Sequence, residues 1–116
     1  WPDSVADLRE GFAGSLNVYR TMAHHPALLR AWADLREHVV HATALGPDLS
    51  EIAILRIGAR LGSTYEWAHH VVRARARGVS EARIASARGA LSDMAQDDAL
   101  ICGAVDELLD ARPPSI

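Results

Sequence analysis

Glu51 is the acidic residue with the most apolar surroundings in the sequence. It lies near the start of the stretch 48–61, and at about 100° per residue it shares a helix face with Leu55 and Gly58. Arg56 projects away from that face and cannot neutralise Glu51 within the helix. Such a carboxylate either finds a partner elsewhere in the fold or favours its protonated form, as a general acid or base requires. The alternative is that Glu51 only occupies the first helical turn, where the helix dipole favours an acid.

A second group of polar residues follows at helical spacing. One polar stripe is formed by Ser63, Glu66, His70, Arg73 and Arg77. Glu66 and His70 stand one helical turn apart, so they can share a proton and present an acid/base pair to a small molecule. The alternative interpretation is structural: Glu66 completes a capping box with Ser63, and the arginines make the stripe a solvated face.

The six histidines raise the question of a metal site. Glu66 and His69 have the Glu-x-x-His spacing of di-iron helical bundles, but the chain has no second motif of this kind. His38 and His41 could contribute to a zinc site, for which a third ligand is missing. We therefore expect no metal and no other cofactor. All 12 basic residues are arginine, so no lysine is present for Schiff-base chemistry.

The composition is that of a small globular protein. The 116 residues, 12.5 kDa in mass, are expected to form one domain over 1–116, trimmed from a somewhat longer chain. A net charge of −3 lacks the basic excess of nucleic-acid binders, and no apolar run is long enough to span a membrane, so we expect neither partner. The single Cys102 excludes an intrachain disulfide and indicates a reducing compartment, the cytoplasm. Aromatic residues make up only 5%, which favours a homo-oligomer because the chain has few large side chains to fill a core.

The elements that must position these residues are all helical. Strand-like alternation is absent, and we predict an all-α fold of five or six helices. Ser4 and Asn17 are expected to cap two short helices, and Pro26 to open the next. That helix is expected over 27–44 and the later ones over 48–61, 63–78, 81–88 and 94–110, with Gly62 ending one helix and Ser80 capping another.

Several motifs resemble, in order and spacing, those of the carboxymuconolactone decarboxylase and alkylhydroperoxidase D-like family. They are Leu45-Gly46-Pro47, Glu51-Ile52-Ala53-Ile54-Leu55-Arg56, Tyr65-Glu66-Trp67-Ala68-His69-His70 and Gly78-Val79-Ser80. The resemblance covers about 47–84 most clearly and 28–109 more weakly. It implies an all-helical domain that assembles as a trimer or hexamer, with the active site between helices and near subunit contacts.

The resemblance also assigns site residues. Peroxidase members use a glutamate, a Cys-x-x-Cys pair and a histidine four residues after the second cysteine. The glutamate falls on Glu51 and the histidine on His70, but the cysteine positions hold Ser63 and Glu66, which cannot form the disulfide that stores two electrons. The decarboxylase branch resembles the Glu66-x-x-x-His70 pattern instead.

We therefore expect a cofactor-independent lyase or isomerase that acts by acid/base chemistry on a small carboxylated or lactone compound. His70 is expected to donate the proton, Glu66 to orient it, and Glu51 to act as a second acid/base group. Ser63 and Tyr65 are expected to add hydrogen bonds to the substrate.

Two other functions remain open from the sequence. One is the hydroperoxidase activity of the family, with Cys102 or a partner's thiol supplying electrons. The other is a non-catalytic, oligomeric small-ligand binder, in which the polar stripe forms surface salt bridges.

Overall fold

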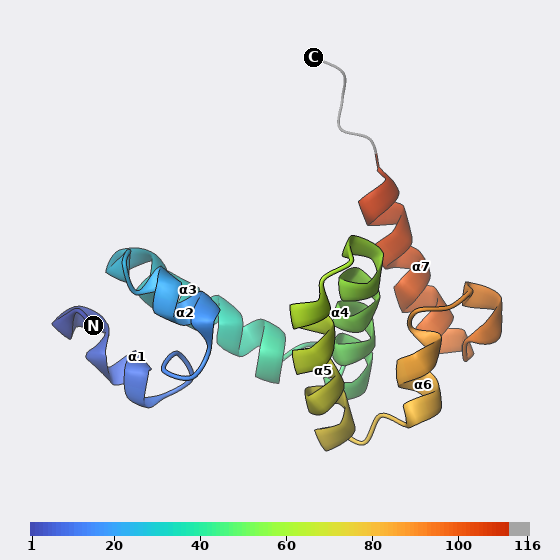
Figure 1. The fold of residues 1–116 in the computed structure, drawn as a ribbon, viewed down its shortest axis with the longest axis horizontal. Helices are drawn as coiled ribbons and strands as arrows, with labels where there is room; N and C mark the ends of the chain where they lie inside the picture. Colours follow the sequence, from blue (N-terminus) through green and yellow to red (C-terminus); the bar gives the residue numbers. More distant parts are fainter. Residues whose placement is uncertain (112–116) are drawn as a thin grey trace, which may run out of the picture. The chain divides into compact units, whose positions relative to one another are not determined.

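The computed structural model describes residues 1–111, and these residues are helical throughout, without a strand (Figure 1). They form seven α-helices and two short 3-10 helices. Each of the seven predicted segments corresponds to one α-helix, so the expected total of five or six was too low. The expected all-α class is confirmed. Within the same residues, no helix combines the length and the apolar character needed to cross a membrane.

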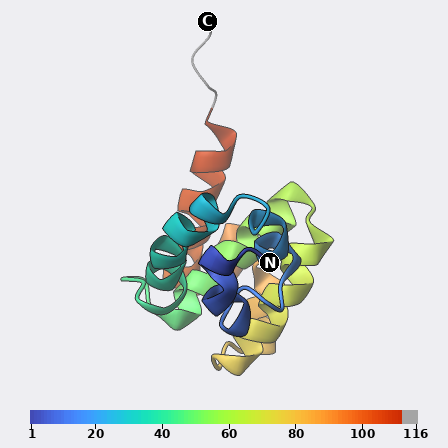
Figure 2. The ribbon, with the colours of Figure 1, turned by 90° about the vertical axis from the view of Figure 1, so that its left-hand side faces the viewer.

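The N-terminal unit comprises Trp1–Ala42. Its elements are η1 (Asp3–Val5), α1 (Ala6–Glu10), α2 (Asn17–Met22) and α3 (Pro26–His41). Both η1 and α2 contact α3 (Figure 2). Its small core consists of Val5, Ala13, Ala23 and Leu29, with Phe12 and Tyr19 packed against it.

The ends of these helices only partly follow the predictions. Helix α3 begins at Pro26 as predicted, and the ring of His25 accepts a hydrogen bond from the Leu28 backbone nitrogen. It ends at His41, three residues earlier than predicted. The capping roles predicted for Ser4 and Asn17 are wrong. Ser4 lies within η1, Asn17 is the first residue of α2, and none of η1, α1 and α2 has a side-chain cap.

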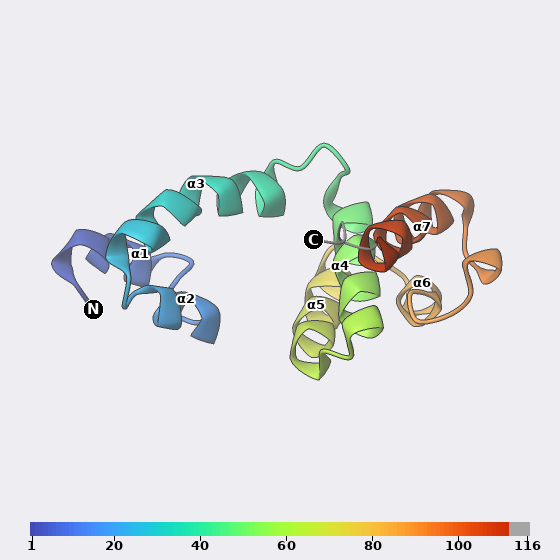
Figure 3. The same ribbon diagram turned by 90° about the horizontal axis from the view of Figure 1, so that it is seen from above.

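The second unit begins at Thr43 and contains the long helices that carry the polar residues. Its elements are α4 (Pro47–Leu61), α5 (Thr64–Ala76), α6 (Glu81–Ser86), η2 (Leu91–Asp93) and α7 (Gln96–Asp110). Helix α4 lies between α5 and α7 and contacts both (Figures 1 and 3). The core between these helices is formed by Ile52, Leu55, Val71, Ala74, Val79, Ile84, Ala87 and Cys102.

A sharp turn sets α5 against α4. Gly62 ends α4 in the left-handed region at φ 67°, where a residue without a Cβ is favoured, and the Ser63 backbone nitrogen donates to the Gly58 carbonyl over 2.9 Å. Gly58 faces α5 closely, since a Cβ added there would meet the Trp67 backbone nitrogen at 3.5 Å. The two helices therefore run back along each other in close contact.

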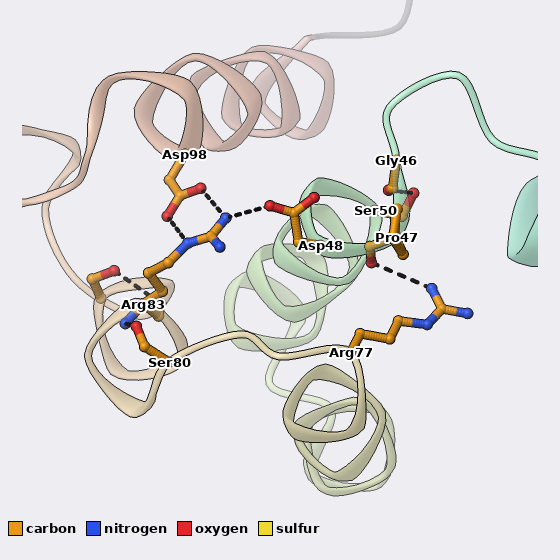
Figure 4. Close-up of polar contacts among 9 residues, drawn as sticks. Gly46, Pro47, Asp48, Ser50, Arg77, Ser80, Arg83 and Asp98 are labelled. Atoms are coloured by element: carbon orange, nitrogen blue, oxygen red, sulfur yellow. Dashed lines mark hydrogen bonds and ion pairs between the residues drawn. The ribbon is translucent and has the colours of Figure 1, made fainter.

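Ion pairs connect α4 with α7 and α6, on the side away from α5. Arg56 holds Asp106 of α7 through two hydrogen bonds of 2.9 and 2.8 Å, and this pairing lowers the pKa of Asp106 to about 2. Arg83 of α6 holds Asp98 of α7 in the same two-pronged way and also contacts Asp48 at the start of α4 (Figure 4). Helix α4 is thus held on its α7 side independently of its contacts with α5.

Candidate functional site

The carboxylate of Glu51 is buried between α4 and α5, with 1% of the residue exposed. Its Oε2 lies 2.7 Å from Nδ1 of His70, and its Oε1 lies 3.0 Å from Nη1 of Arg77. Nε of Arg73 stands farther off, at 3.7 Å from the same Oε1. The partners of Glu51 therefore come from outside α4: they are His70 and Arg73 of α5, and Arg77, the residue that follows α5.

His70, Arg73 and Arg77 recur at the three- and four-residue spacing of one helix face. That face is turned towards α4, because all three side chains contact Glu51. Only 16% of the His70 side chain and 18% of the Arg77 side chain are exposed. The alternative that this stripe is a solvated face is wrong for these two residues. The sequence analysis placed both arginines on the stripe but did not identify them as partners of Glu51.

Arg77 also reaches the beginning of α4. Its Nη1 donates to the Pro47 carbonyl over 3.3 Å, next to Gly46 and Ser50, where the Ser50 hydroxyl donates to the Gly46 carbonyl (Figure 4). One guanidinium thus contacts both the buried carboxylate and the first turn of the helix that carries it. This double contact fixes the distance between the end of α5 and the start of α4.

Glu66 lies on the outer side of His70. Its Oε2 is 3.4 Å from Nε2 of the imidazole, and half of the side chain is exposed. Ser63 caps α5 as predicted, since its hydroxyl accepts from the Glu66 backbone nitrogen. In a complete capping box the Glu66 carboxylate would accept from the Ser63 backbone nitrogen. Here that nitrogen donates to the Gly58 carbonyl, and the Glu66 carboxylate faces His70 instead.

The imidazole of His70 therefore stands between a buried and an exposed carboxylate. An ionised carboxylate only accepts hydrogen bonds, so Nδ1 carries a proton in this contact when Glu51 is ionised. Nε2 is then the nitrogen that can exchange a proton with a ligand or with Glu66. A histidine with one ring nitrogen on a buried carboxylate and the other near an exposed one can take up and release protons, as general acid/base chemistry requires.

The two residues predicted to bind the substrate lie apart from each other. Ser63 borders a cavity of about 310 Å³ that Trp67 and Arg88 also line, with the Arg88 guanidinium 3.8 Å above the Trp67 ring. Tyr65 stacks on His69, with 4.3 Å between the ring centres, about 100° around α5 from Glu66. The structure brings Glu51, Glu66 and His70 together but does not place Tyr65 with them.

Cys102 of α7 is fully buried in the apolar core, beside residues such as Ile52 and Leu55. Burial raises the pKa of its thiol, so the reactive thiolate form is disfavoured. Within residues 1–111, no group of three or more histidine, cysteine, aspartate or glutamate side chains is arranged to hold a metal ion.

The model of the carboxymuconolactone decarboxylase family matches residues 26–108, well over half of the 116 residues. The chain belongs to the carboxymuconolactone decarboxylase family. This confirms the resemblance seen in the sequence. The matched stretch includes the Glu51 cluster, which consists of Glu51, Glu66, His70, Arg73 and Arg77. No curated protein and no solved structure matches the chain significantly.

Proposed function

We propose that this member of the carboxymuconolactone decarboxylase family is a cofactor-independent acid/base enzyme acting on a small carboxylated or lactone compound. The observation that carries the proposal is the position of the His70 imidazole, whose Nδ1 lies 2.7 Å from Glu51 and whose Nε2 lies 3.4 Å from Glu66. Both contacts are made without a thiol, a feature that favours proton transfer over thiol peroxidase chemistry.

The proposed reaction is the loss of CO2 from a lactone acid. The bond between the ring and the carboxyl carbon breaks, and its electron pair spreads into the conjugated lactone carbonyl. A proton must then be delivered to carbon, and His70 donates it from Nε2. Glu51 stabilises the imidazolium form before this step, and the exposed Glu66 returns a proton from solvent to Nε2.

The two other functions have less support. A hydroperoxidase route through Cys102 needs a reactive thiolate, whereas this thiol is buried and its pKa is raised. A binder with only surface salt bridges does not account for a carboxylate that is 1% exposed.

A homo-oligomer, as a trimer or hexamer, belongs to the same proposal. Its support is the apolar side of α3, where large side chains recur at helical spacing and are 39–49% exposed: Leu28, Trp32, Leu35 and Val39.

The test is turnover of 4-carboxymuconolactone by the purified protein, followed as CO2 release and as loss of ultraviolet absorbance. His70→Ala is expected to lower the rate by about 100-fold or more, the usual contribution of a general acid. His69→Ala is the matched control, because His69 is the adjacent, exposed residue that contacts Tyr65. Equal rates for wild type and His70→Ala would refute the assignment, and an inactive wild type would reject this substrate.

A further inference from the structure

Arg73 is the partly exposed guanidinium of the Glu51 cluster. Its Nε lies 3.7 Å from Oε1 of Glu51, too far for a hydrogen bond, and the same oxygen is already contacted by Arg77 at 3.0 Å. Within residues 1–111, neither Nη group of Arg73 forms a hydrogen bond, and the ion pair with Glu51 is a loose one. With 31% of its side chain exposed, this residue offers unused donors at the edge of the cluster.

Other arginines of the same unit are arranged differently. Arg56, Arg75 and Arg83 each hold one carboxylate through two nitrogens, namely those of Asp106, Glu81 and Asp98. A guanidinium matches a carboxylate in this two-pronged geometry, so the bound carboxylate occupies one edge of the guanidinium. Within residues 1–111, no carboxylate is bound to the Arg73 guanidinium through two hydrogen bonds.

The position of Arg73 relates it to His70. The two residues are three apart on α5, so they share a helix face, and each contacts a different oxygen of Glu51. A carboxylate held by the Nη groups of Arg73 would therefore lie beside the imidazole. It would also lie away from Glu66, which is on the opposite, N-terminal side of His70 along the helix.

We propose that Arg73 binds a carboxylate of the substrate and thereby selects small organic anions for the His70 site. This inference rests on the proposed function, because it assigns the substrate class of the same site. Arg77 does not take this role, since its Nη1 is already engaged with Glu51 and with the Pro47 carbonyl.

The test measures binding separately from turnover. 4-Carboxymuconolactone and its neutral dimethyl ester are titrated calorimetrically into His70→Ala protein, which does not consume the probe. Arg73→Gln in that background is expected to weaken binding of the acid by about tenfold or more, because it removes a charge-assisted contact, and to leave the ester affinity within about twofold. Arg73→Lys, which keeps the charge but loses the fork, is expected to give an intermediate affinity.

Arg75→Gln is the matched control, because Arg75 lies on the same helix and is paired with Glu81. It is expected to change neither affinity, and circular dichroism verifies that each variant is folded. An unchanged acid affinity in Arg73→Gln, an equal loss for acid and ester, or failure of the background protein to bind the acid would each overturn the proposal. Acid binding that depends on Arg73 in a protein whose wild type shows no turnover would support the anion site and reject the decarboxylase reaction.

Discussion

Nδ1 of His70 lies 2.7 Å from Oε2 of Glu51, although 19 residues separate the two in the sequence. The contact exists because Gly62 and Ser63 reverse the chain between α4 and α5, so the polar face of α5 meets the one acidic residue on the facing side of α4. The carboxylate sits at the inner end of the pair and the imidazole at the outer end. Glu51 is therefore shielded from solvent, whereas the His70 imidazole is partly exposed.

Replacing Glu51 with glutamine tests whether this carboxylate acts in the chemistry. Glu51→Gln keeps the size but leaves His70 and Arg77 without their anion. The rate of lactone decarboxylation is expected to fall by about 100-fold, and the free energy of unfolding by about 1–3 kcal/mol, since a buried charged group loses its hydrogen-bonding partner. Steady-state rates and urea unfolding measure the two effects.

A comparison with Glu81→Gln separates the buried carboxylate from an exposed one. Glu81 forms a solvent-exposed pair with Arg75, and its replacement is expected to change neither rate nor stability noticeably. If Glu51→Gln behaved in the same way, the interpretation of the cluster as surface salt bridges would stand.

The thiol of Cys102 is expected to be structural. Cys102→Ser places a hydroxyl in the apolar core and should lower the free energy of unfolding by about 1–3 kcal/mol, whereas decarboxylation should be unaffected. Because burial raises the pKa of the thiol, alkylation by iodoacetamide should be slow in the folded protein and fast in urea. Rapid alkylation of the folded protein, or hydroperoxide turnover that disappears in the serine variant, would contradict this prediction.

The pairing of Asp106 with Arg56 predicts a particular acid sensitivity. Hydrogen bonds from Arg56 lower the pKa of Asp106 in the folded protein to about 2, against 3.8 in the unfolded chain. A carboxyl group with a lowered folded-state pKa stabilises the fold above pH 3.8, and this contribution is lost as the pH falls towards 2.

Asp106→Asn isolates this contribution from that of other acids. At pH 6 the free energy of unfolding of the variant is expected to be about 1–3 kcal/mol lower than that of wild type, since the variant loses charged hydrogen bonds. The difference should shrink between pH 4 and 2, as measured by urea titrations at each pH. A difference that is constant over this range would show that the ion pair does not set the acid response.

The sequence predicted the long helices and the start of α6 well, and the starts of the two short N-terminal helices poorly. Pro26, Gly62 and Ser80 are strong local signals, because each fixes a backbone conformation or supplies a cap, and the structure uses all three. Asn17 was misassigned as a cap because helices of five or six residues show no periodicity against which a start can be checked.

The site was predictable in its members but not in its contacts. Helical phase identified Glu51 and the stripe of His70, because both depend only on spacing along one helix. Which way the stripe faces depends on how α4 and α5 cross, so the engagement of Arg77 with Glu51 could not be derived. For the same reason, the sequence could not show which way Tyr65 faces; in the structure its ring packs against His69.

The double contact of Arg77 with Glu51 and with the Pro47 carbonyl closes a short segment of chain on itself, spanning 30 residues. The entropic cost of closing such a segment rises only slowly with its length, and α4 and α5 within it are joined by a single turn. The Glu51 cluster should therefore assemble as soon as the α4–α5 hairpin forms, before the chain beyond Gly78 has packed. In native-state hydrogen exchange, the amides of α4 and α5 should then open together as one cooperative unit.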